Sequence, residues 1–279
     1  MGHEHISILP NFLLLDLETT PQGKVLKIGA VLGARAFLRN GRFDAREAVA
    51  SLDRFAAHAD GVAGHNLLLH DLPVLSEFAP AARLLRLPVA DTLFLSPICF
   101  PENPYHRLVK DYKLVTESLN DPVADARLAG TLLADEIASL RGMAQAAPDV
   151  FRGLRFLLCS EVGADARLAR GMQRVFAAAN GPDAPTEAEG RELLTALMGQ
   201  WACRTAARFL SEIDFGSAEA RWALAYALTW MRVSGADSVL PAWVRLHNRL
   251  LVRLLSRLRD VPCDDPACAY CRSIHDPEQ

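Results

Sequence analysis

The apolar pattern of the chain changes near Gly142, and this change constrains the fold more than any other feature of the sequence. Before it, short apolar runs suited to strands alternate with helical stripes, whereas only helical patterns follow it. The strand-like runs are Phe12–Asp16, Val25–Val31, Ala36–Arg39, Gly61–Gly64 and Pro88–Leu93. Strands that come first and are then interleaved with helices indicate a mixed α/β sheet flanked by helices. We therefore predict an α/β domain over 1–142, a helical domain over 143–260 and a Cys/His-rich tail over 261–279.

Helix-start signals divide the rest of the chain. In the first half we expect helices over 47–58, 71–78 and 122–140. The last of these has Asn120 or Asp121 as its cap and Pro122 in its first position. In the second half, Thr186 and Glu189 form a capping box that opens a helix. The helices of this half are expected over 187–209, 218–233 and 241–259.

The composition excludes several classes of protein. Hydrophobic residues make up 51% and charged residues 23% of the 279 residues, which is typical of globular domains. No apolar run approaches the roughly 18 residues of a membrane helix, and the first residues resemble no secretory signal. We therefore expect a cytoplasmic protein with no membrane partner. The net charge of −3 excludes a polycation but allows a local basic face that binds nucleic acid.

The first strand-like run ends in two carboxylates, Asp16 and Glu18. Alternate residues of a strand share one face, so both carboxylates point the same way. Two carboxylates this close repel each other unless a cation lies between them, and their oxygens suit Mg²⁺ or Mn²⁺. Most pairs of this kind are solvated surface groups, so a metal site needs further acidic residues.

Two further acidic residues stand at the starts of helices. Asp71 begins the helix expected at 71–78, shortly after the short strand that ends at Gly64. Asp125 lies in the first turn of the helix that begins at Pro122.

Together, these segments resemble the motifs of a known family. FLLLDLETT, GHNLLLHDLPVL and NDPVADARLAG are similar, in this order, to the three motifs of the DEDD 3′–5′ exonucleases, which are ribonuclease H-like nucleases. The similarity covers about residues 10–142, roughly half of the chain. It implies a ribonuclease H-like fold for the α/β domain.

The resemblance also implies a chemistry. The four acidic positions of the family are filled here by Asp16, Glu18, Asp71 and Asp125. In this family they hold two divalent ions, Mg²⁺ or Mn²⁺, which activate a water and stabilise the leaving 3′ oxygen during phosphodiester hydrolysis. We expect a metal-dependent 3′–5′ exonuclease that acts on single-stranded DNA or on 3′ ends. We also expect Asn66, Lys110 and Lys113 to contact the nucleic acid.

The chain departs from this family at one position. The branch with this spacing has a His five residues before the last acid, where it helps to deprotonate the water, and this chain has Asn120. An Asn cannot act as a general base near neutral pH, although it can orient a water or cap the helix. His106 is the candidate substitute base, and the alternative is that His106 is an ordinary surface or packed residue.

A wider resemblance concerns the context of the domain. PENPYHRLVKDYKLV, which leads into LNDPVADARLAG, resembles the exonuclease-like N-terminal region of large bacterial RecQ-type DNA helicases. The terminal CDDPACAYCRSIHDP is similar to the region that precedes the helicase motor in those chains. The chain has no Gly-x-x-x-x-Gly-Lys-Ser/Thr nucleotide loop, so it contains no helicase motor. The resemblance implies a part in DNA repair, either as a piece of such a helicase or as a free-standing relative.

Metal-binding residue types gather near the end of the chain. Cys263, Cys268, Cys271 and His275 lie within 13 residues, and the Cys-x2-Cys spacing is typical of a metal knuckle. We predict a structural Zn²⁺ held by three thiolates and one imidazole. The alternatives are an iron–sulfur cluster that takes Cys203 as its fourth ligand, and reduced thiols on a mobile tail.

Four arginines repeat at every fourth residue along the helix expected at 241–259, namely Arg245, Arg249, Arg253 and Arg257. Residues four apart lie on one helix face, and a stripe of this kind suits contacts to the phosphate backbone of a nucleic acid. The alternative is a solvated face opposite the leucines of the same helix.

Two functions from different classes remain open. The first is a 3′–5′ exonuclease on DNA, which the four acidic residues favour. The second is an exonuclease-like module of a helicase that binds nucleic acid and cleaves it weakly or not at all, which Asn120 favours.

Overall fold

The computed structural model describes most of the chain. Described are residues 9, 11–103, 121–162, 166–201, 205, 208, 213–232, 244, 248–260, 262–263 and 265–275, without the side chains of 258–260 and 273–275. The chain divides into two compact units and passes from one to the other several times. The first unit takes its residues from 1–95, 107–138 and 166–178, and the second from 96–106, 139–165 and 179–279. The three linear domains expected from the sequence stay a prediction.

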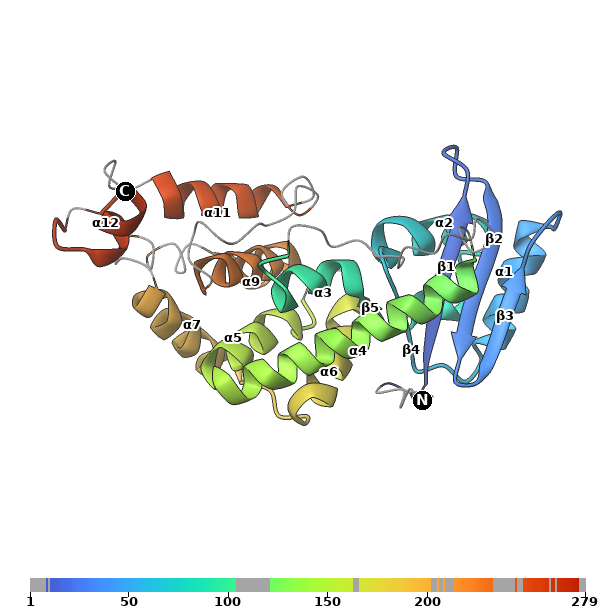
Figure 1. Cartoon of the computed structure of the whole chain (residues 1–279), viewed down its shortest axis with the longest axis horizontal. Helices are drawn as coiled ribbons and strands as arrows, with labels where there is room; N and C mark the ends of the chain where they lie inside the picture. Colours follow the sequence, from blue (N-terminus) through green and yellow to red (C-terminus); the bar gives the residue numbers. More distant parts are fainter. Residues whose placement is uncertain are drawn as a thin grey trace, which may run out of the picture. The chain divides into compact units, whose positions relative to one another are not determined.

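The first unit contains a five-stranded mixed sheet (Figure 1). Its strands are β1 (Phe12–Thr19), β2 (Val25–Leu32), β3 (Arg35–Arg39), β4 (Gly61–Gly64) and β5 (Val89–Asp91). They lie in the order β3-β2-β1-β4-β5. Strands β1, β2 and β3 pair antiparallel, while β4 pairs in parallel with both β1 and β5. The predicted mixed sheet is confirmed, and β1 continues past Asp16 to Thr19, so that both of its carboxylates lie within the strand.

Strand β1 separates a hydrophobic core from a polar face. Its odd-numbered residues from Leu13 to Leu17 are at most 5% exposed and belong to the core of the first unit. Its even-numbered residues from Leu14 to Glu18 are half-buried on the opposite face. Burial of one leucine side chain stabilises a fold by about 2 kcal/mol. The three odd-numbered leucines therefore fix which face of β1 is turned to the core, and the carboxylates lie on the other face.

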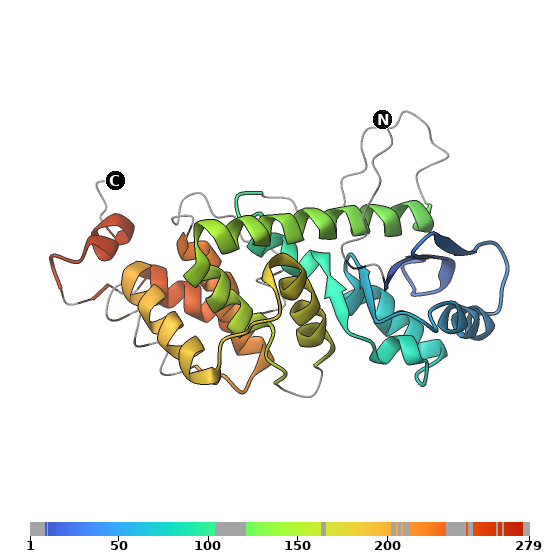
Figure 2. The ribbon, with the colours of Figure 1, turned by 90° about the horizontal axis from the view of Figure 1, so that it is seen from below.

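Helices cover both faces of the sheet (Figures 1 and 2). Helices α1 (Ala45–Phe55) and α2 (Leu72–Phe78) contribute buried apolar residues to the core side. Helix α4 (Pro122–Ala146) lies on the other side, where a Cβ added at Gly130 would be 2.6 Å from Cδ1 of Leu14. This close approach brings the start of α4 to the face that carries the carboxylates of β1.

The remaining helices include those of the second unit. They are α3 (Thr92–Cys99), α5 (Pro148–Leu158), α6 (Arg167–Asn180), α7 (Glu187–Trp201), α9 (Ala218–Arg232), α11 (Arg249–Asp260) and α12 (Ala269–His275). After Gly142 the described residues contain helices and no strand, as predicted. The predicted capping box is confirmed, since the amide of Thr186 donates to Oε2 of Glu189 at 2.8 Å and the amide of Glu189 donates to Oγ1 of Thr186 at 3.3 Å.

A buried arginine joins three helices of the second unit. Arg221 of α9 is 3% exposed, and its guanidinium donates to the carbonyl oxygens of Phe215 (2.6 Å) and Phe156 (3.1 Å). It also donates to Oγ of Ser160 (2.8 Å) and to Oε2 of Glu187 (3.1 Å). Removal of one partner from a buried charged pair is strongly destabilising, so we assign Arg221 to the packing of these helices. None of the described helices is long and apolar enough to cross a lipid bilayer.

Candidate metal sites

Three acidic side chains converge in the first unit. Asp16 and Glu18 of β1 and Asp125 of α4 each bring a carboxylate oxygen within 4.8 Å of the other two. We call these three residues the acidic group. Asp16 and Glu18 are half-buried, and Asp125 is 9% exposed. Of the four acidic residues predicted to converge, these three lie together. Asp125 joins the group although it is more than 100 positions from the other two in the sequence.

A glycine allows Asp125 to reach β1. Gly29 of β2 pairs with Asp16 across the sheet, and a Cβ at Gly29 would lie 2.2 Å from the carbonyl carbon of Pro122. The backbone of α4 thus rests directly on the backbone of β2, beside Asp16. Asp121 caps this helix, because its Oδ1 accepts the amide of Val123 at 3.0 Å. The first turn of α4 then delivers Asp125 to the same face.

The electrostatics of the acidic group favour a cation. Three carboxylates within 4.8 Å repel one another, and a divalent ion between them removes this repulsion. Oxygen donors of this type suit Mg²⁺ and Mn²⁺, so the residues present fit the predicted ions. The N-terminus of the 25-residue helix α4 adds a positive partial charge that stabilises negative charge in its first turn.

Asp71 lies outside the acidic group. It ends a one-turn π-helix, Leu67–Asp71, and is 2% exposed. Its Oδ1 accepts a hydrogen bond of 3.1 Å from the amide of Leu17, and Leu17 is the residue between Asp16 and Glu18. Burial raises the pKa of Asp71, while its hydrogen bonds with His70 and Leu17 oppose that shift. In this structure Asp71 therefore holds the backbone of β1 between the two strand carboxylates.

His70 is a residue beside this site that the sequence analysis did not single out. Its Nδ1 lies 3.2 Å from Oδ1 of Asp71, and its Nε2 lies 3.0 Å from Oγ1 of Thr19. The hydrogen bond with Asp71 raises the pKa of His70, burial lowers it, and the charges of Asp16 and Glu18 raise it further. The only sequence signal was a titratable residue directly before the acid of the second motif.

Asp91 fixes the turn that leads to Asp71. It is 1% exposed, and its carboxylate accepts the amides of Asn66 (2.9 Å), Leu68 (2.9 Å) and Leu93 (3.1 Å). Burial raises the pKa of Asp91 to about 7 against the effect of these bonds. The bond to Leu93 also ends β5 and begins α3, so the strand predicted to run to Leu93 stops at Asp91. Asn66 takes the left-handed conformation (φ 69°) in this turn, which brings the next residue, Leu67, into the core.

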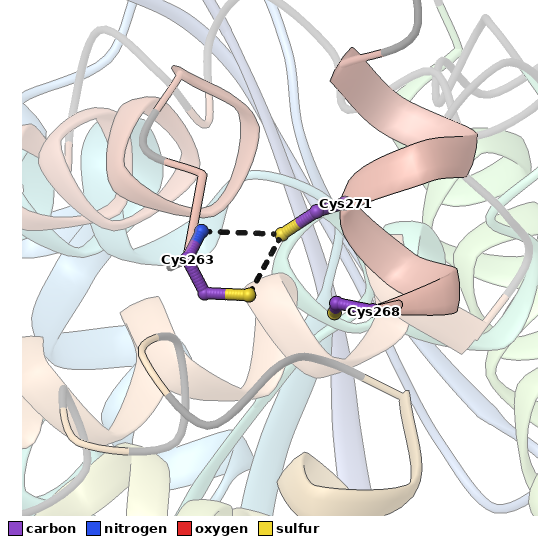
Figure 3. A group of neighbouring side chains, drawn as sticks. All are labelled: Cys263, Cys268 and Cys271. Atoms are coloured by element: carbon purple, nitrogen blue, oxygen red, sulfur yellow. Dashed lines mark hydrogen bonds between the residues drawn. The ribbon is translucent and has the colours of Figure 1, made fainter. Parts of the chain in front are cut away.

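Three thiols converge in the second unit (Figure 3). The sulfur atoms of Cys263, Cys268 and Cys271, which we call the thiol group, lie within 4.8 Å of one another. The amide of Cys263 donates to Sγ of Cys271 at 3.3 Å, and the two sulfur atoms are 3.5 Å apart. Thiolates are the preferred ligands of zinc and of iron–sulfur clusters, so these residues fit either metal. The side chain of His275 and all of Cys203 lie outside the described residues.

Part of the predicted basic surface lies on α11. Arg249, Arg253 and Arg257 are exposed there, and the last two line a groove of about 400 Å³ together with Ser217 at the start of α9. Asp214 also lines this groove, so its charge is mixed. Of the other predicted nucleic-acid contacts, Asn66 lies in the turn that Asp91 fixes, whereas Lys110, Lys113 and Arg245 lie outside the described residues. The candidate base His106 and Asn120 also lie outside them.

Comparisons with protein-family models, with curated proteins and with solved structures give no match for this chain.

Proposed function

We propose that the first unit is a metal-dependent 3′–5′ exonuclease of the DEDD, ribonuclease H-like type that acts on DNA. The observation that carries the proposal is the convergence of Asp16, Glu18 and Asp125 on one face of a mixed sheet. A scaffold with no chemistry gains nothing from three carboxylates that repel one another. The motif resemblance of residues 10–142 supplies the reaction and the direction of cleavage.

The residues of the chain have separate roles in this proposal. Asp16, Glu18 and Asp125 hold two Mg²⁺ or Mn²⁺ ions. Asp71, which lies outside the acidic group, fills the fourth acidic position of the family motifs. Bound ions of this kind lower the pKa of a water and stabilise the leaving oxygen. Through its bond to the amide of Leu17, Asp71 also keeps the two carboxylates of β1 in position.

Other parts of the chain bind the substrate or hold the fold in this proposal. The exposed arginines of α11 contact the phosphate backbone of single-stranded DNA or of 3′ ends. The thiol group holds a structural Zn²⁺ with His275 as fourth ligand, and the alternative is an iron–sulfur cluster that uses Cys203. The protein acts in the cytoplasm in DNA repair, alongside a RecQ-type helicase motor in the same polypeptide, and the alternative is a free-standing relative of such a region.

A single assay tests the enzyme. The parent and Asp16→Ala are incubated with end-labelled single-stranded DNA and either Mg²⁺ or Mn²⁺. Metal catalysis is worth several kcal/mol, so we expect cleavage by the variant to fall by about 10²–10⁴-fold. Equal degradation by the two proteins would show that the activity comes from a contaminant and would contradict the proposal.

The second candidate is a module that binds DNA and cleaves it weakly or not at all. Two observations favour it: Asn120 replaces the expected His, and Asp71 lies outside the acidic group. DNA binding by the parent at low salt, with no metal-dependent cleavage, would support this candidate. Reversal of charge at Arg249 and Arg253 should then weaken binding without affecting the thermal stability of the first unit.

A further inference from the structure

Few of the described side chains in the C-terminal segment 262–275 are buried. Among its described side chains, at positions 262–263 and 265–272, only that of Cys271 is buried, at 8% exposure. Its single helix, α12, has seven residues. Isolated helices shorter than about 12 residues are marginal in water, so helix propensity and the burial of the described side chains give this segment little stability.

The contacts within the segment centre on sulfur instead. Cys271 of α12 accepts the amide of Cys263 at 3.3 Å and lies 3.5 Å from its sulfur. Between them, the carbonyl oxygen of Asp265 accepts the amide of Cys268 at 3.1 Å, which closes a turn. The three thiols therefore lie close together where the loop and α12 meet (Figure 3). Arg272 of α12 also donates to the carbonyl oxygens of Ala267 (3.2 Å) and Cys268 (3.0 Å) there.

We propose that segment 262–275 is a metal-folded module, in which Cys263, Cys268 and Cys271 bind one Zn²⁺ as thiolates and the ion takes the place of a hydrophobic core. This inference rests on the zinc assignment of the proposed function and adds that folding and metal binding are one event. Each thiol loses its proton to solvent when the ion binds, so binding releases up to three protons. In a tetrahedral site with Zn–S bonds of about 2.3 Å, two sulfurs are about 3.8 Å apart. The sulfur spacing in the segment is compatible with this value.

The test follows amide hydrogen exchange in the full-length protein, with Zn²⁺ as the probe. We expect one zinc per chain as purified, together with slow exchange in 265–275. Removal of the ion with a chelator should speed exchange there by at least roughly tenfold, because the segment then opens with a free energy near zero. Exchange in β1 and β4 should not change, and added Zn²⁺ should restore the slow exchange.

Two variants separate the thiol group from other cysteines. Cys268→Ser should lose zinc and the protection of 265–275, whereas Cys159→Ala, which removes a buried thiol after α5, should keep both. If the parent binds zinc but exchange in 265–275 is the same with and without it, the coupling to folding is wrong while the zinc assignment stands. If the protein binds no zinc, or is brown and contains iron, both the zinc assignment and this inference are wrong. None of these outcomes affects the exonuclease proposal, which concerns the acidic group.

Discussion

The acidic group and the thiol group each bring three ligand atoms within 4.8 Å, but the chain builds them in opposite ways. The acidic group stands on β1 and α4, in a unit whose core residues are almost fully buried. The thiol group stands on a loop and a seven-residue helix with one buried side chain among those described. Backbone packing thus sets the first geometry before an ion binds, whereas in our proposal the ion itself sets the second.

The largest effect on cleavage is expected when the backbone contact between Gly29 and Pro122, which positions Asp125, is broken. In Gly29→Ala the new Cβ would lie 2.2 Å from the carbonyl carbon of Pro122, so α4 must move and take Asp125 with it. Overpacking costs about 1–3 kcal/mol of stability, and a shift of about 1 Å lowers a rate by about 10²-fold. We expect losses of this size in the free energy of unfolding and in single-turnover cleavage of DNA.

Gly142 of α4, the helix that Gly29 contacts, provides a matched control. It is exposed, and a Cβ at this position would have no atom within 4 Å. Gly142→Ala should therefore raise stability by up to about 1 kcal/mol, because alanine favours the helix, and it should leave cleavage unchanged. Normal cleavage by Gly29→Ala would mean that packing does not set the acidic group, and the contrast between the two groups would fail.

A smaller effect on Mg²⁺ affinity and cleavage is expected when the hydrogen bonds of His70 beside Asp71 are lost. His70→Phe removes the contacts to Oδ1 of Asp71 and to Oγ1 of Thr19, so that the amide of Leu17 alone holds this oxygen. Loss of a group that orients metal ligands typically costs about 10- to 100-fold, and we expect roughly this decrease in Mg²⁺ affinity or in cleavage. The exposed His58 supplies the control, since His58→Phe should change neither quantity. If cleavage by His70→Phe depends on the Mg²⁺ concentration as cleavage by the parent does, His70 has no role in the site.

A separate effect, on the pH dependence of stability rather than on cleavage, concerns the turn that Asp91 fixes. The pKa of Asp91 rises from 3.8 to about 7 on folding, so between these values the folded protein holds a proton that the unfolded chain has released. The contribution of Asp91 to stability is therefore greatest below about pH 4 and falls as pH rises to about 7, by up to about 4 kcal/mol. In Asp91→Asn this part of the pH dependence should be absent, as measured by urea unfolding at pH 5 and pH 8 with circular dichroism.

Asp53 separates protonation from the loss of a hydrogen-bond acceptor. Asp53 also accepts two backbone amides, those of Arg83 (3.0 Å) and Leu84 (2.8 Å), but it is only half-buried. Asp53→Asn should lower stability at both pH values, because one of the two backbone amides loses its acceptor. If the free energy of unfolding of Asp91→Asn changes between pH 5 and pH 8 as much as that of the parent, Asp91 is not the source of the pH dependence.

Short-range rules account for what the sequence could predict of the acidic group. Alternation along β1 places Asp16 and Glu18 on one face, and a capped helix start places Asp125 in a first turn. The contacts of the second motif depend on tertiary structure instead. His70 meets Thr19 across 51 positions, and Asp71 meets Leu17 across 54. A π-helical turn that no local pattern indicated sets the direction of both side chains.

The thiol group was found from spacing alone, because Cys-x2-Cys in a tight turn restricts where two sulfurs can lie. The helix that carries Cys271 was not predicted, since seven residues are too few to show a periodic pattern. The sequence also could not tell which residues of the second unit serve its fold. Arg221 belongs to an arginine-rich region, yet its guanidinium is buried among backbone and side-chain oxygens.

The contact between Gly29 and Pro122 joins two backbones, and it therefore depends on very little of the surrounding sequence. Most side chains near it can drift over evolution while the three acids stay together, as long as the strand residue opposite the first acid has no Cβ. The glycine that faces the first acid is consequently the one residue of this contact whose identity the geometry dictates, because the helix contributes only backbone atoms.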